Sequence, residues 1–317
     1  MAIAGGSLVV SNDVSAVTPE TWSDVLQIPL YKTLVAMETC NMDIRDELTY
    51  GDVLKKQYFD ALSAQTYIPG TSFTAQAQDY HTDSLTVDKY RTVAIYVDDI
   101  EELQSNVNLR TSMQEEVAYQ LRDVIDQNAL QNMVSGDVRD GAEMVAGGVA
   151  DHGVSATTAN IIDIFSKARK NLRVNNVAEA GDWIAIVHPD VANLIEHKAT
   201  SVGYNVADST LRNGYAGDFM GFKIYVSNNV PTGTDLSGET AFAGADGCTA
   251  QIIGNYEIAY FGKKGAIDVA LQKAPSIQIT KVPDMHGYYI SAYTVYGSTT
   301  FTKNASRFLS VGVIGLN

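Results

Sequence analysis

The sequence predicts an α+β protein in which a long helix, a mixed α/β unit and a β-rich C-terminal part follow one another. Three observations support this fold class. Between about residues 109 and 135, apolar side chains recur at intervals of three and four, the period of an amphipathic helix. From about 158 to 227, helical and strand patterns alternate. Beyond residue 250, short runs have the composition of strands. We therefore expect one large unit or two interlocked units.

Composition and charge narrow the classes of function. Of the 317 residues, 45% are hydrophobic and 19% are charged, which excludes a disordered tail protein. The 22 Lys and Arg residues against 37 Asp and Glu residues give a formal net charge of -15. That balance argues against a protein whose main task is to grip nucleic acid by neutralising phosphates. It also argues against a polybasic membrane anchor.

Compartment signals favour the cytoplasm as the place where the chain is made. No apolar run approaches the ~20 residues of a membrane span. The first cation is Lys32, so we expect no secretory signal, which would begin with a basic segment. Cys40 and Cys248 lie far apart without a CxxC spacing, and we expect small buried hydrophobic residues in a reducing compartment rather than a disulfide or metal framework.

The first part of the chain predicts an arm and an extended hairpin. Residues 1–50 are weakly patterned, with a short helix opening near Trp22. Residues 53–59 predict one strand and 85–97 a second with a period of two, separated by the polar stretch 60–84. Arms of about 22 residues would reach about 70 Å. Because an isolated two-stranded ribbon is marginal in water, we expect this hairpin to lie on another subunit.

A long helix follows the acidic run 98–102. Capping-box spacings at Thr111 and Ser112 indicate its beginning, and Gly136 stands where a C-terminal cap belongs. About 25 residues make a rod near 38 Å long, about twice the average helix, which suggests the backbone of the molecule. Its predicted core face consists of Leu109, Met113, Val117, Leu121, Val124 and Ile125.

The α/β unit comes next, and more strands follow it. The spacing predicts a helix over 158–173, a buried strand over 182–188 and a helix beginning at Pro189. A further strand is expected at 221–227. One side of the first helix is basic, and we favour a solvated or intersubunit face over a nucleic-acid contact. That basic side includes Lys167, Arg169 and Lys170. After this unit, further strands are expected at 251–261, 266–272, 277–282 and 288–301.

Signatures of catalysis are missing from the sequence. It contains no GxGxxG, Walker loop, GxSxG, HExxH or SxxK motif. His188 and His197, with Glu196 beside the latter, would form a metal site only if the fold brought them together. We favour ordinary polar residues at the ends of elements. The sequence therefore predicts no catalytic residue, no metal site and no cofactor.

The order of these parts resembles the major capsid proteins of tailed double-stranded DNA phages, which have the Hong Kong 97-like coat fold. Specific segments carry the resemblance as well. Residues 85–105 look like the return strand of the family's extended loop, and Asp126 and Leu130 occupy its typical positions on the spine helix. Residues 168–172 resemble a helix of the family, and residues 183–189 resemble a strand with a proline after it. Residues 221–231 resemble a strand followed by Ser-Asn-Asn-Val-Pro.

The resemblance implies a division into domains. Residues 1–50 would be the N-terminal arm and 51–97 the extended loop. Residues 98–156 and 265–317 would form the peripheral domain, with the spine helix at about 109–135. Residues 157–264 would form the axial α/β domain.

The resemblance also implies a function without chemistry. Many copies would assemble, as pentamers and hexamers, into the icosahedral shell that encloses the packaged double-stranded DNA, with only weak non-specific contact to that DNA. The implied location is the virion capsid, after synthesis in the host cytoplasm, with no membrane. A separate scaffolding protein and a portal are expected partners, and a decoration protein is a further candidate. Candidate intersubunit contacts are Tyr67, Ile68, Pro69, Tyr80, Trp22, Lys167, Arg169 and Lys170.

Two alternatives stay open at the level of sequence. One is the shell of an encapsulin-like compartment, which has the same fold and encloses an enzyme. A more remote one is a cytosolic metal-dependent enzyme that uses His188, His197 and Glu196.

Overall fold

The structure is a computed structural model, and it describes residues 30–46, 51–72, 75–105, 109–135, 137–139, 144–146, 154–178, 183–202, 218–231, 256–283 and 285–314. Trp22 and Cys248 lie outside these ranges. Cys40 is a buried free thiol, as predicted. No helix in the described ranges is long and apolar enough to cross a membrane.

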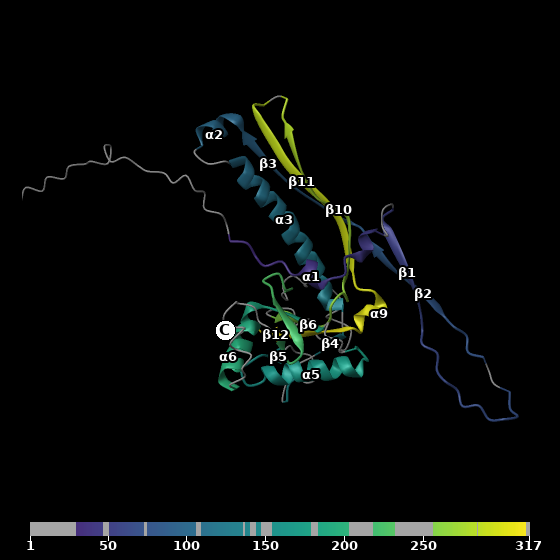
Figure 1. The fold of residues 1–317 in the computed structure, drawn as a ribbon. Coiled ribbons are helices and arrows are strands. Elements are labelled where there is room, and N and C mark those ends of the chain that lie inside the picture. The colour runs from purple at the N-terminus through teal and green to yellow at the C-terminus, as the bar shows by residue number, and fades with distance from the viewer. Residues whose placement is uncertain are drawn as a thin grey trace, which may run out of the picture.

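The long helix is the spine of the molecule. Helix α3 (Leu109–Gln131) continues as a 3-10 turn, η2 (Asn132–Ser135), which confirms the predicted helix. It runs alongside an antiparallel three-stranded sheet of β10 (Asp268–Lys281), β11 (Gly287–Thr299) and β3 (Lys89–Asp98), as Figure 1 shows. The short helix α2 (Asp99–Gln104) precedes it, and the Asp98 carboxylate accepts a hydrogen bond from the backbone N–H of Ile100 at its beginning.

One face of α3 packs on this sheet through apolar side chains. Val117 and Leu121 are buried against Val97, Ile290 and Ala292. Further along, Ile125 is buried against Leu271 and Tyr296. Full burial of a leucine side chain contributes about 1.5–3 kcal/mol. Of the remaining residues of the predicted core face, Met113 and Val124 are partly buried, and the side chain of Leu109 lies outside the described part of the chain.

The second body is an α/β unit built on one larger sheet. Its strand order is β4-β12-β9-β6-β8-β7, with β5 beside β12. At its centre, β6 (Trp183–Val187) runs parallel to β8 (Phe222–Val226) and antiparallel to β9 (Tyr256–Lys263). The short strands are β4 (Asp137–Arg139), β5 (Val154–Ser155) and β7 (Asp218–Phe219).

Both faces of this sheet are covered, so β6 is buried along its whole length. Helices α5 (Ile161–Val174) and α6 (Pro189–Val202) share a core with Ala185 and Val187 on one face. The alternate residues Ile184 and Ile186 belong to a second core, which includes the end of the spine at Leu130 and the short helix α1 (Ala36–Thr39). The spine is thus joined to the α/β unit by a continuous apolar core.

A strand that the sequence analysis missed completes this sheet. Strand β12 (Phe308–Ile314) pairs antiparallel with β9 and parallel with β4 and β5. The sheet therefore draws on residues outside 157–264, including 308–314. Two of the predicted strands, 266–272 and 277–282, are also one element: β10 continues across register shifts between Leu271 and Ser276.

The extended hairpin differs from the prediction in its length. Strands β1 (Val53–Phe59) and β2 (Tyr80–Thr86) form an antiparallel ladder of 7 residues a side, and the described residues beyond it, 60–72 and 75–79, have no strand pairing. The predicted single strand 85–97 is wrong, because β2 ends at Thr86 and β3 then pairs with β11.

Close packing explains the break between β2 and β3. A Cβ on Gly297 of β11 would lie 2.2 Å from the carbonyl oxygen of Thr86, so only glycine lets the chain cross β11 at this point. The N–H of Val87 donates instead to the carbonyl of Asp52, 2.8 Å away. The remaining short elements are η1 (Asp43–Asp46) and α9 (Thr302–Ala305).

Candidate functional site

The hairpin projects away from both bodies, as Figure 1 shows. It also exposes large apolar side chains. Tyr67 and Ile68, beyond the ladder, are 61% and 63% exposed, and Tyr80 at its end is 74% exposed. Pro69 is exposed beside them. Phe59 and Leu62 are similarly exposed. A group of exposed large apolar residues on one projecting element is typical of a surface that contacts another protein.

The root of the hairpin is bound to its own chain. Leu85 and Val87 are buried against Ile44, Ala270 and Phe301.

Polar contacts to α9 hold the same region. The carboxylate of Asp83 accepts hydrogen bonds from the N–H of Thr302 at 2.8 Å and from its hydroxyl at 3.0 Å. Asp60 pairs with Lys303 at 3.1 Å and with His81 at 3.1 Å. The hydrogen bond from Lys303, followed by that from His81, lowers the pKa of Asp60. The direction in which the hairpin leaves the body is therefore fixed by the subunit itself.

Beyond Phe59 the two arms of the hairpin contact each other only lightly. The side-chain amide of Gln76 donates to the carbonyl and the hydroxyl of Ser63, both at 3.0 Å, and that of Gln78 donates to the carbonyl of Asp60 at 3.0 Å. These side-chain bonds replace the backbone ladder. We call residues 61–79 the tip of the hairpin.

A buried polar group fastens the arm segment 30–39 to the spine. Asp126 of α3 accepts hydrogen bonds from the N–H groups of Val35 and Ala36 at 2.8 and 2.7 Å, so it satisfies donors at the beginning of α1. Its other oxygen accepts from the side-chain amide of Asn229 at 2.9 Å.

The same amide nitrogen of Asn229 donates to Asp123 at 2.7 Å. Lys32 donates to the amide oxygen of Asn229 at 2.9 Å and lies 3.7 Å from Asp123. We call Lys32, Asp123, Asp126 and Asn229 the polar joint.

Two carboxylates and one ammonium leave the polar joint with a net negative charge. Asp126 is only 2% exposed, and burial raises its pKa despite the hydrogen bonds that it accepts. Sequence reasoning had singled out Asp126 and the segment 221–231 separately and had missed their contact. The available signal was two aspartates three residues apart on the spine, because a helix places such residues on one face.

The basic residues of α5 form no uniform exposed face. Lys170 is exposed, whereas Lys167 and Arg169 are half-buried. Arg169 lies beside Gly221, where an added Cβ would be 3.8 Å from the guanidinium carbon.

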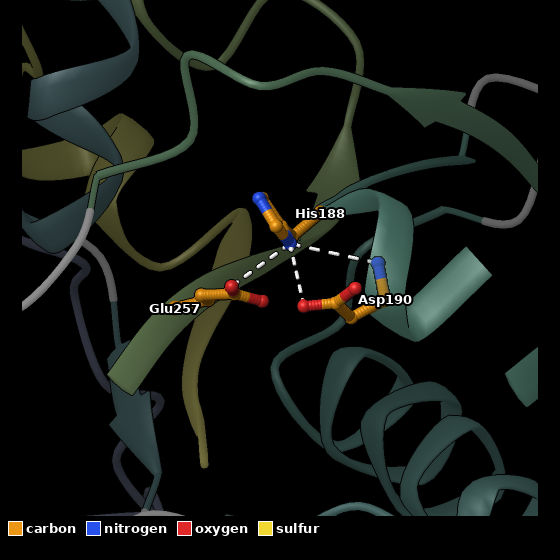
Figure 2. A group of neighbouring side chains, drawn as sticks. All are labelled: His188, Asp190 and Glu257. Carbon is orange, nitrogen blue, oxygen red and sulfur yellow. Dashed lines mark hydrogen bonds and ion pairs between the residues drawn. The ribbon is translucent and has the colours of Figure 1, made fainter. Parts of the chain in front are cut away.

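The histidines do not form the site that the enzyme alternative requires. His197 and Glu196 are exposed on α6. His188 instead faces Asp190 and Glu257, and Figure 2 shows both carboxylates directed at the same ring nitrogen. These three residues are the one group of metal-ligating side chains that the described ranges bring within 4.8 Å.

A family model described as phage capsid protein matches residues 81–305. No curated protein matches the sequence significantly.

Solved structures show the same fold. A chain from Mycobacterium phage Che8 is similar with a TM-score of 0.73 at 20% identity, over 92% of this chain and 96% of that one. The capsid structure of the cyanophage P-SCSP1u gives 0.67 at 15% identity, over 96% and 95%. The mature capsid of bacteriophage PhiM1 gives 0.67 at 14% identity, over 95% and 93%. These likenesses confirm the predicted α+β, Hong Kong 97-like fold.

Proposed function

Because the chain belongs to the phage capsid protein family and is a structural subunit of the phage capsid, we propose that it assembles into a closed icosahedral shell around packaged double-stranded DNA. Pentamers and hexamers of this one chain would form the shell. The role is mechanical, and no catalytic step is part of it. Neither the encapsulin-like compartment nor the metal-dependent enzyme gains support from the comparisons.

The hairpin is the observation that carries this proposal. Its root is fixed by Asp83 and by the buried side chains of Leu85 and Val87, whereas Tyr67 and Ile68 of the tip are exposed. A ribbon anchored at one end and apolar at the other is suited to lie across a neighbouring copy. Each such contact is modest, but a shell repeats it in every subunit, and linked contacts reinforce one another.

The domain division becomes part of the same proposal. Residues 1–50 serve as the arm, and 51–97 contain the extended loop together with β3. The spine region, 98–156 with 265–317, forms the peripheral domain, and 157–264 form most of the axial domain. The candidate contacts are Tyr67, Ile68, Pro69 and Tyr80 on the loop, Trp22 in the arm, and Lys167, Arg169 and Lys170 on the axial domain.

Partners and location follow from the capsid role. The protein is located in the virion capsid, and we propose that it is made in the host cytoplasm. A scaffolding protein and a portal assist assembly, and a decoration protein is a further candidate. With a net charge of -15, the subunit contacts DNA weakly and contains it mechanically.

Removing the tip of the hairpin tests the proposal. The variant lacks residues 61–79 and has a Gly-Gly link that joins Asp60 to Tyr80. It keeps the β1–β2 ladder and the root. We expect a soluble chain that melts like the wild type but forms no closed shells in negative-stain microscopy, whether expressed alone or with the neighbouring genes of its phage. The full-length chain, expressed in the same way, is the control. Normal shells from the shortened chain would overturn the proposed role of the hairpin.

A further inference from the structure

Three side chains from three elements meet at one end of the α/β sheet. His188 follows β6, Asp190 lies in the first turn of α6, and Glu257 is the second residue of β9 (Figure 2). The Nδ1 atom of His188 lies 2.8 Å from a Glu257 oxygen and 3.3 Å from an Asp190 oxygen. The three ligand atoms all lie within 4.8 Å of one another.

Hydrogen bonding inside the chain leaves this group incomplete. One ring nitrogen faces two carboxylates, and Nδ1 has at most one proton to donate. The second oxygen of Glu257 is buried and has no hydrogen-bond partner among the residues that the structure describes. Among the described residues, His188 is the only cationic group paired with Asp190 or Glu257. Two carboxylates therefore share at most one positive charge in a partly buried position, where Glu257 is 16% exposed.

We propose that His188, Asp190 and Glu257 bind one divalent transition-metal cation, with Zn²⁺ or Mn²⁺ as the best match. One imidazole nitrogen and two carboxylate oxygens form a mixed ligand set that suits these ions. Mg²⁺ and Ca²⁺ prefer oxygen ligands throughout. The Asp190 side chain is 52% exposed, so water can complete the coordination.

The separations agree with this assignment. Ligands about 2.1 Å from a metal ion stand roughly 3.0–3.4 Å apart at angles between square and tetrahedral. The two measured separations from Nδ1 are close to that range. The N–H of Asp190 also points to Nδ1, but at 3.5 Å it is a long contact that a metal ion would replace.

Proton competition makes the site sensitive to pH. The cation must displace the proton from Nδ1, so binding strengthens as pH rises. The bound ion would tie the end of β6 and the beginning of α6 to β9. This inference does not depend on shell formation, because a single subunit contains all three ligands.

Calorimetric titration of the purified full-length chain with ZnCl2, MnCl2 and MgCl2 tests the site. For the wild type we expect one Zn²⁺ or Mn²⁺ bound per chain, more tightly at pH 7.5 than at pH 6, and much weaker binding of Mg²⁺. His188→Asn and Glu257→Gln should each weaken binding at least about tenfold. The metal should also raise the melting temperature of the wild type alone.

His197→Asn is the matched control, because His197 is an exposed histidine on α6, the helix that carries Asp190. We expect it to bind like the wild type. Absence of saturable 1:1 binding, equal binding of Mg²⁺, or unchanged binding in Glu257→Gln would each overturn the proposal. If His188→Asn does not fold, Glu257→Gln, which keeps the shape of the side chain, decides alone.

Discussion

The polar joint and the tip of the hairpin differ in whether their side chains find partners within the same chain. In the joint, Asp126 is 2% exposed, yet both of its oxygens accept hydrogen bonds from the same chain. In the tip, Ile68 is 63% exposed, and its apolar surface is covered by nothing in the described chain. The joint is complete within one subunit, whereas we propose that the tip is covered by a neighbouring copy.

On the proposed function, the joint serves the folding of the subunit and the tip serves its assembly. A buried polar group without its partner costs about 1–3 kcal/mol, so the joint must be finished when the subunit folds. Exposed apolar surface costs nothing further when the subunit folds and is stabilising only when it is buried later. Mutations in the two regions should therefore affect different measurements.

The largest effect is expected on the apolar side of the spine. Leu121→Asp places an unpaired charge at a position with 0% exposure, against Val97 and Ile290. We expect a loss of more than about 4 kcal/mol in the free energy of unfolding, and little soluble protein, because a buried charge without a partner is strongly destabilising. Chemical unfolding followed by circular dichroism measures it. Gln120→Asp, at the exposed neighbouring position, should change stability by less than about 1 kcal/mol.

The joint itself should give the next largest effect. Asp126→Ala removes the acceptor of the Val35 and Ala36 N–H groups and one acceptor of Asn229. We expect a loss of about 2–4 kcal/mol in urea unfolding, since buried donors then lack partners. Glu115→Ala, at an exposed position of the same helix, is the control. A loss no larger than that of the control would show that the joint does not stabilise the subunit.

Titration of Asp126 should give a smaller effect of defined sign. Burial raises its pKa in the folded state, so the folded chain holds this proton more tightly than the unfolded chain does. The proton on Asp126 therefore stabilises the folded chain. This stabilisation is complete below the usual aspartate pKa and is lost as pH rises through the higher pKa of Asp126 in the folded state. The unfolding free energy of the wild type minus that of Asp126→Asn should therefore fall between acidic pH and pH 7. A difference that grows with pH would mean that the hydrogen bonds outweigh burial.

The tip should show the smallest effect on stability. The double variant Tyr67→Ser and Ile68→Ser changes two exposed side chains, so its unfolding free energy should stay within about 0.5 kcal/mol of the wild type. The yield of closed shells, measured by sedimentation, should drop severely. Gln65→Ser, a polar change in the same tip, should leave the yield unchanged. A clear loss of stability in the double variant would show that the tip packs on its own subunit.

The predicted elements were most accurate where the local pattern was strong. The spine helix was predicted at about 109–135 and is found at 109–131 with a 3-10 turn to 135. The helix beginning at Pro189 starts there, because proline fits the first turn of a helix and not its interior. Strand β12 was missed: its seven residues at 308–314 follow the last predicted strand, 288–301.

The candidate sites were less predictable. The enzyme alternative paired His188 with the nearby Glu196 and His197, but α6 leaves those two exposed and the sheet brings Glu257 to His188 instead. Asp126 was noted on the spine without its partner, and Asn229 lies 103 positions further along the chain. Neither contact has a periodic signature.

Patterns in the sequence were sufficient to predict the long helix, most of the other elements, the charge and the order of parts that resembles a phage coat. Those properties arise from neighbours three, four or two positions apart, which a pattern in the chain displays directly. Two features became visible only in the folded chain. After Thr86 the chain crosses Gly297 of β11 and continues as β3, which pairs with β11. Asn229 lies against Asp123 and Asp126 of the spine. These outcomes depend on close packing and on hydrogen bonds between distant residues, which exist only once the chain has folded.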